Sequence, residues 1–150
     1  MQELPHHYKV AATAVPEGEV GLASDRLDTI RSAPPKEFGG PGDRWSPETL
    51  LIAAIADCFI LTFRAIAAAS KLSWVSLRCE VEGTLDRKEG STKFTEYLIK
   101  ATLDVPTDTD EAKAHRILLK TEAGCLVTNS LSGTTNLNTE VRVVPTQVPL

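Results

Sequence analysis

The sequence predicts an α+β fold in which short strands precede one long helix and longer strands follow it. Residues 47–70 are almost continuously apolar and follow residues that favour a helix start, while residues 74–85 and 93–103 read as strands. The chain has 150 residues, 42% hydrophobic and 24% charged, so it can bury a core without disulfide crosslinks. We therefore expect a single domain over residues 1–150.

The N-terminal part, residues 1–45, is expected to be a β-hairpin region that ends in a turn rich in Gly and Pro. The pattern from His7 to Ile30 is β-like, and Pro16–Glu19 read as a hairpin turn. A third short strand is predicted over residues 26–30. Residues 32–42 follow as an ordered turn region, because they are dense in residues that break regular structure.

The long helix is predicted from Pro47 to about Ser70. Ser46 is a preferred N-cap, Pro47 suits the first helical position, and Glu48 complements the positive end of the helix dipole. Apolar residues cover most of the helix circumference, which predicts a helix surrounded by protein. A transmembrane helix is disfavoured, because Asp57 and Arg64 would each cost about 2.5–3.5 kcal/mol in the middle of a bilayer.

The core, residues 46–150, continues beyond this helix with two long strands, Trp74–Leu85 and Lys93–Leu103, joined by a charged loop. In the first strand the residues expected to face the core are Val75, Leu77, Cys79 and Val81. A second helix, capped by Thr107 or Asp108, is expected to end at Gly124. A short separate helix after it and a last strand over Leu137–Val144 complete the prediction.

Charge and targeting signals narrow the functional classes. The net charge of -4 and a pI near 5.4 provide no basic field, so nucleic acid is not an expected partner. The N-terminal residues lack a basic region followed by an apolar run, so we expect a cytoplasmic protein with reduced thiols. We also expect neither a metal site nor a phosphate-binding loop, because no ligand spacing and no G-x-G-x-x-G motif occurs.

Three cysteines remain as candidates for chemistry. Cys58 lies in the middle of the long helix, and Cys125 follows Gly124 at the entrance of the short helix, where a helix N-terminus would stabilise a thiolate. Cys79 lies on an inward strand face and is interpreted as packing. By residue type alone, a buried Cys is more often a small hydrophobic side chain than a reactive thiol.

The arrangement of four motifs resembles the OsmC/Ohr family over nearly the whole chain. These motifs are Phe38-Gly39-Gly40, Ser46-Pro47-Glu48-Thr49-Leu50-Leu51, Ala54-Ile55-Ala56-Asp57-Cys58-Phe59, and Gly124-Cys125-Leu126-Val127-Thr128-Asn129-Ser130-Leu131. Family members are small homodimeric thiol peroxidases of the oxidative stress response that reduce organic hydroperoxides, and some also reduce hydrogen peroxide. The resemblance implies antiparallel sheets packed around two long central helices in an intertwined homodimer.

The resemblance also implies the residue roles. Cys58 matches the peroxidatic cysteine, Cys125 the resolving cysteine, and Glu48 the acidic residue that holds the active-site arginine of the family. No cofactor is implied beyond an external dithiol reductant, of the lipoyl type or a small dithiol. Phe59 and Phe63 could line a pocket for an alkyl hydroperoxide, although core packing is their plainer interpretation.

Helix geometry bears on Glu48 and Cys58. They are ten residues apart, which at about 1.5 Å per residue places them roughly 15 Å apart along one straight helix. If both belong to one active site, the simplest arrangement places Glu48 of one subunit opposite Cys58 of the other. We therefore expect a homodimer.

The sequence departs from the family pattern at the arginine. The position of the peroxide-activating arginine falls on or near Val20, and no arginine occurs before Arg26. Arg44 and Arg26 are candidate charge partners, and each can equally be an ordinary solvated side chain. A smaller departure is Leu126, where proline is frequent in the family. The alternative function is a weakly catalytic or non-catalytic protein of the same fold that binds or senses a small molecule.

Overall fold

The computed structural model describes residues 1–145. The chain divides into two compact units, residues 1–51 and 52–150, and the described part of the second unit ends at residue 145. The boundary falls inside the long helix, a few residues after the one expected at residue 46. We describe each unit by itself.

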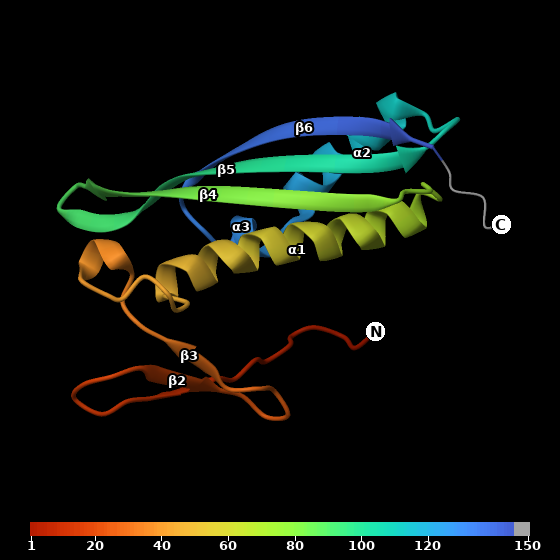
Figure 1. Ribbon diagram of the computed structural model, residues 1–150. Coiled ribbons are helices and arrows are strands. Elements are labelled where there is room, and N and C mark those ends of the chain that lie inside the picture. The colour runs from red at the N-terminus through yellow and green to blue at the C-terminus, as the bar shows by residue number, and fades with distance from the viewer. Residues whose placement is uncertain (146–150) are drawn as a thin grey trace. The chain divides into compact units, whose positions relative to one another are not determined.

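The first unit is a three-stranded antiparallel sheet followed by an ordered turn (Figure 1). Its strands β1 (Ala11–Thr13), β2 (Val20–Ala23) and β3 (Ile30–Ser32) pair in that order. The third strand begins later than predicted, because residues 24–27 form a turn in which the Leu27 N–H donates to the Ser24 carbonyl oxygen at 3.1 Å.

The expectation of an ordered Gly/Pro-rich turn is confirmed. A short 3₁₀ helix, η1 (Lys36–Phe38), ends at Gly39 in the left-handed conformation. The N–H groups of Phe38 and Gly40 both donate to the carbonyl oxygen of Pro35. A Cβ atom at Gly40 would overlap the backbone of Pro34, so this close approach requires glycine.

The long helix α1 (Pro47–Ala69) begins as predicted, with Ser46 as its N-cap. The Ser46 hydroxyl accepts the Thr49 N–H at 3.1 Å, and the Thr49 hydroxyl accepts the Ser46 N–H at 2.9 Å. This reciprocal arrangement is a capping box in which Thr takes the place of the usual Glu or Gln.

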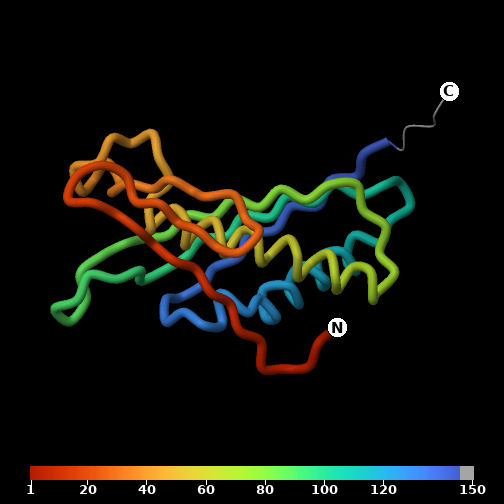
Figure 2. Tube along the Cα trace, turned by 90° about the horizontal axis from the view of Figure 1, so that it is seen from below, coloured from red at the N-terminus to blue at the C-terminus, as the bar shows by residue number. Residues whose placement is uncertain are grey.

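The second unit contains a three-stranded sheet with its helices on one face (Figures 1 and 2). Strands β4 (Ser76–Lys88), β5 (Ser91–Pro106) and β6 (Thr134–Val144) lie in that order, with β5 in the centre. The β4–β5 loop is only two residues long, Glu89 and Gly90, and both have positive φ, as a type I′ turn requires. Both strands are therefore longer than predicted.

The sheet of the second unit is mixed, so the expectation of purely antiparallel sheets is wrong for it. Strand β5 pairs with β4 antiparallel and with β6 parallel. Helices α2 (Glu111–Gly124) and α3 (Leu126–Asn129) form the crossover between β5 and β6. A crossover of this kind returns the chain to the end of the sheet at which β5 begins, so that β6 runs parallel to β5.

The start of α2 also differs from the prediction. Its N-cap is Asp110, whose carboxylate accepts the Lys113 N–H at 3.1 Å. Asp108 has a φ of 69° and lies in the preceding turn. The end of α2 at Gly124 and the short separate helix α3 are as predicted.

The core lies between the β4–β5–β6 sheet and the helices. Alternate residues of β5 point into it, and they meet one stripe from α1 and one from α2. The stripe of α1 comprises Ile55, Phe59, Phe63 and Ala67. In β4 the inward positions from Leu77 to Val81 are half-buried as predicted, but Val75 is 56% exposed, because the strand begins at the next residue.

The described residues cover the rest of the α1 surface only in part, so the expectation of a helix surrounded by protein is wrong for one subunit. Only 22% of its most apolar 18-residue window is buried, although the mean hydropathy of that window is 2.1. The helix is long and apolar enough to cross a membrane by length and composition alone, but its buried stripe is part of the core of the domain.

Two adjacent leucines of α2 test this description of the core. Leu118 is fully buried, and Leu119 is 57% exposed. We expect Leu118→Ala to lower the free energy of unfolding by about 2–5 kcal/mol, because it leaves a cavity in the core. The matched control, Leu119→Ala, should change it by about 0.5 kcal/mol or less. Denaturant unfolding of both variants measures the difference, and equal losses would contradict the assignment.

Candidate active site at Cys58

Cys58 lies in the middle of α1, one residue before the buried stripe position Phe59. This placement puts its sulfur at the edge of the stripe, where it is half-buried. The Thr62 hydroxyl, one helical turn further along, lies 3.8 Å from the Cys58 sulfur. Residues four apart on a helix share one face, so the two side chains can interact directly.

The junction between α2 and α3 provides the other neighbours of Cys58. Cys125 is fully buried and is the N-cap of α3, where the chain leaves helical geometry between the two helices. Burial by itself would raise the pKa of Cys58. Hydrogen bonds from the Val127 N–H, the Cys125 thiol, the Thr62 hydroxyl and the Leu126 N–H outweigh burial, so the pKa of Cys58 lies below its ordinary value.

The start of α3 also acts on Cys58, for which no such support was visible in the sequence. The first N–H groups of α3, those of Leu126 and Val127, lower the pKa of Cys58. Cys125 is the residue from which the short helix starts. The acidity that the sequence predicts for Cys125 stays a prediction.

Cys79 differs from Cys58 in its environment. It lies on β4 among the partly buried residues that pack against the core. Burial, together with the nearby Cys125, raises the pKa of Cys79 to about 12. Its thiol therefore stays protonated at neutral pH, in agreement with the packing role expected from the sequence.

Phe59 and Phe63 are core residues. Both are fully buried, and the Phe63 ring meets the Trp74 ring edge-on at a centroid distance of 5.3 Å. Both residues therefore pack in the core, as their plainer interpretation expects, and their role as the wall of a substrate pocket stays a prediction.

Glu48 lies in the first turn of α1 and lines a cavity of about 290 Å³ in the N-terminal unit. Val20, the position matched to the arginine of the family, lines the same cavity. Its other lining residues are Ser32, Ala33, Pro34, Pro35, Phe38 and Pro47. Within residues 1–145, the buried Oε2 atom of Glu48 has no hydrogen-bond partner.

The guanidinium of Arg44 pairs with carboxylates other than that of Glu48. Its Nε donates to Glu19 at 3.0 Å, and its Nη1 lies 3.6 Å from Asp43. The hydrogen bond and charge of Glu19, followed by the charge of Asp43, raise the pKa of Arg44. Arg31 also approaches Glu19, at 3.8 Å. The exposed Glu19–Arg44 pair is thus a feature of the first unit that the sequence reading did not identify.

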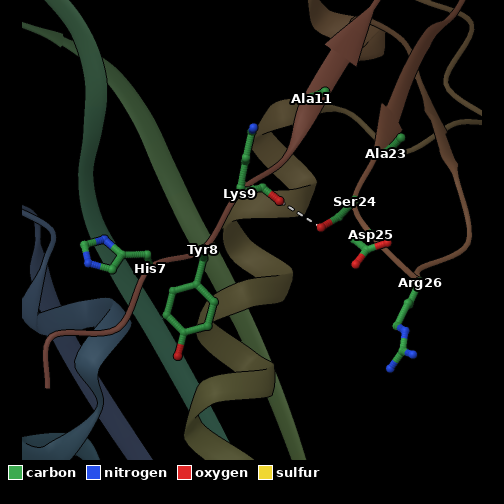
Figure 3. Close-up of a pocket in the computed structure, with 8 residues that line it drawn as sticks. All are labelled: His7, Tyr8, Lys9, Ala11, Ala23, Ser24, Asp25 and Arg26. Atoms are coloured by element: carbon green, nitrogen blue, oxygen red, sulfur yellow. Dashed lines mark hydrogen bonds between the residues drawn. The ribbon is translucent and has the colours of Figure 1, made fainter. Parts of the chain in front are cut away.

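Arg26 lies in a different place from Glu48. It is exposed, has a φ of 65°, and lines an open depression formed by the segment before β1 and the end of β2 (Figure 3). The side chains of His7 and Arg26 extend to opposite sides of this depression, and the Ser24 hydroxyl donates to the Lys9 carbonyl oxygen at 2.8 Å. These contacts give Arg26 no link to the carboxylate of Glu48.

Sequence reasoning missed three of the groups around Cys58, namely Thr62 and the N–H groups of Leu126 and Val127. Thr62 carried a usable signal, because it follows Cys58 by one helical turn. No sequence signal identified the N–H groups of Leu126 and Val127, since the direction of these donors depends on tertiary packing. In the part of the chain that the structure describes, no group of three His, Cys, Asp or Glu residues could hold a metal ion.

The three thiols should differ in reactivity. We expect iodoacetamide at pH 7 to label Cys58 far faster than Cys79, because the pKa of Cys58 is lowered and that of Cys79 is raised, while Cys125 is protected by burial. Peptide mapping by mass spectrometry identifies the labelled site. The Cys79→Ala variant should label like the wild type, and Cys58→Ser should lose the fast reaction. Fast labelling at Cys79 would refute the assignment.

Comparison with known proteins agrees with this geometry. The model of the OsmC-like protein family matches residues 40–140. The uncharacterized protein YmaD of Bacillus subtilis is 30% identical over 142 residues, which cover 92% of this chain and 94% of YmaD.

Two solved structures show the same fold. An organic hydroperoxide resistance protein OsmC of Legionella pneumophila has a TM-score of 0.73 and 25% identity, over 94% of this chain and 100% of that one. An OsmC-like protein of unknown function from Vibrio cholerae has a TM-score of 0.79 and 15% identity, over 91% of this chain and 99% of that one. On the match over residues 40–140 and the similarity to YmaD, the chain belongs to the OsmC-like protein family.

Proposed function

We propose that the protein is a thiol-dependent peroxidase that reduces organic hydroperoxides, with Cys58 as the attacking thiol and Cys125 as the resolving thiol. The surroundings of Cys58 carry the proposal. Its sulfur lies 3.8 Å from the Thr62 hydroxyl, and Cys125 is buried at the start of α3. The thiol of Cys125 is among the groups that lower the pKa of Cys58. A low pKa provides the nucleophilic thiolate at neutral pH. Family membership and the name of the Legionella relative support the choice of hydroperoxide as substrate.

The first step forms a sulfenic acid. The Cys58 thiolate attacks the terminal oxygen of the hydroperoxide, a sulfur–oxygen bond forms, and the oxygen–oxygen bond breaks. The alkoxide that leaves takes up one proton and becomes an alcohol. Cys58 is oxidised by two electrons, and the hydroperoxide is reduced by two.

The second step closes a disulfide. The sulfur of Cys125 attacks the sulfur of the sulfenic acid, the sulfur–oxygen bond breaks, and the hydroxyl group leaves with a proton as water. An external dithiol then returns both cysteines to thiols by two exchange reactions and is itself oxidised to a disulfide. A reducing cytoplasm, the expected location, would keep the pair in its thiol form.

We also propose that the active form is a homodimer. The apolar surface of α1 supports this, because most of it is uncovered in one chain and a second copy would bury it. Glu48 and Cys58 lie ten residues apart on the same continuous helix, so a site that uses both would take them from different subunits. The unpartnered oxygen of Glu48 is consistent with a site that is incomplete in one chain.

A second candidate function follows from the position of Val20. The cavity that Val20 and Glu48 share is lined mainly by apolar residues and has no guanidinium among its lining residues. A protein of this fold without the activating charge could bind or sense an apolar ligand instead of turning over peroxide. Peroxide consumption no faster than that of a free thiol, together with an ordinary pKa at Cys58, would favour this candidate.

Single cysteine variants test the peroxidase. We expect Cys58→Ser to lose turnover of cumene hydroperoxide with a dithiol reductant, because the nucleophile is gone. Cys125→Ser should accumulate sulfenic acid at Cys58, which dimedone traps and mass spectrometry detects. Cys79→Ala is the matched control and should retain turnover. Full activity of Cys58→Ser would end the proposal.

Sedimentation tests the dimer. We expect a species of twice the 16.2 kDa chain mass at micromolar concentration. Leu61→Asp should shift the equilibrium toward monomer, because Leu61 is an exposed apolar residue of α1, 52% accessible in one chain. A monomeric wild-type protein with full peroxidase activity would contradict the proposed arrangement.

A further inference from the structure

We propose that Thr62 is a positioning residue for Cys58: its hydroxyl donates a hydrogen bond to the Cys58 sulfur and stabilises the thiolate. The inference rests on the proposed function for its role in turnover. The contact itself is independent of any substrate. In this proposal a neutral side chain contributes part of the stabilisation of the thiolate that a cation would otherwise provide.

The two branches of Thr62 face different neighbours. The hydroxyl lies 3.8 Å from the Cys58 sulfur, within hydrogen-bond range for sulfur. The methyl group faces the end of α2, since a Cβ atom placed on Gly124 would lie 3.6 Å from it. Thr62 follows Cys58 by one helical turn, so helix geometry places the two side chains on one face of α1.

A hydroxyl in this position matters because no described cation acts on Cys58. On α1, Asp57 and Arg64 are exposed, and neither is among the groups that shift the pKa of Cys58. At the α2–α3 junction the titratable neighbour is Cys125, which also contributes to the raised pKa of Cys79 on β4. Apart from Cys125, which the reaction would itself consume, the donors are Thr62 and two backbone N–H groups. Thr62 is therefore the one donor that a substitution can remove without altering the backbone or the redox pair.

The test is the pH profile of alkylation at Cys58, followed by peptide mapping so that each cysteine is read separately. Thr62→Val keeps the shape of the side chain and removes the hydroxyl. We expect the midpoint of the profile to rise by about half to one pH unit, and the rate below the midpoint to fall about three- to tenfold. Thr62→Ser keeps the hydroxyl and should stay close to the wild type.

Thr128→Val is the matched control. It also removes a hydroxyl at the α2–α3 junction, but that hydroxyl donates to the Cys125 carbonyl oxygen at 3.1 Å and not to Cys58. Its midpoint should not move. An unchanged midpoint in Thr62→Val, or equal shifts in Thr62→Val and Thr128→Val, would overturn the proposal. Thr62→Ala should shift the midpoint in the same direction and provides a second variant if valine packs poorly.

The readout separates this inference from the proposed function, because alkylation requires no peroxide. A shifted midpoint in a protein without peroxide turnover would refute the peroxidase and leave the role of Thr62 intact. Normal peroxide turnover, together with an unchanged midpoint in Thr62→Val, would support the peroxidase and refute the role of Thr62. If both hold, Thr62→Val should lower peroxide turnover at pH 6 more than at pH 9, where the thiol is ionised in either case.

Discussion

The packing of one stripe of α1 against the β4–β5–β6 sheet is the constraint on which the site depends. Ile55, Phe59, Phe63 and Ala67 recur every four residues and are fully buried. Once Phe59 points into the core, helix geometry places Cys58 at the edge of the stripe, and Thr62 follows on the same face. The hydrophobic contact thus fixes the direction of the thiol, although the thiol takes no part in it.

The break between α2 and α3 provides backbone hydrogen-bond donors to the Cys58 thiol. A continuous helix would satisfy its own N–H groups, but a helix that starts again at Leu126 leaves its first donors free for a neighbour. Those donors act on Cys58, and Cys125 stands at the same break. Cys125 and the backbone donors that lower the pKa of Cys58 therefore come from one local feature of the chain.

The electrostatics of α1 differs between its first turn and its middle. At Cys58, in the middle, neutral hydrogen-bond donors outweigh the cost of burying a charge. At Glu48, in the first turn, a carboxylate oxygen is buried without a donor from the described residues, in a cavity that Val20 also lines. Two arginines of the first unit, Arg44 and Arg31, pair with Glu19. The groups that lower the pKa of Cys58 are therefore neutral hydrogen-bond donors and not a cation.

The sequence by itself determined the order of the elements, the start of α1 at Ser46 and the short helix after Gly124. These features are local, since caps, turns and apolar periodicity act over a few residues. The parallel pairing of β6, the exposed apolar side of α1 and the donors to Cys58 were decided only by the tertiary structure. Each of them depends on segments far apart in the chain, and no local pattern specifies which N–H group will meet which sulfur.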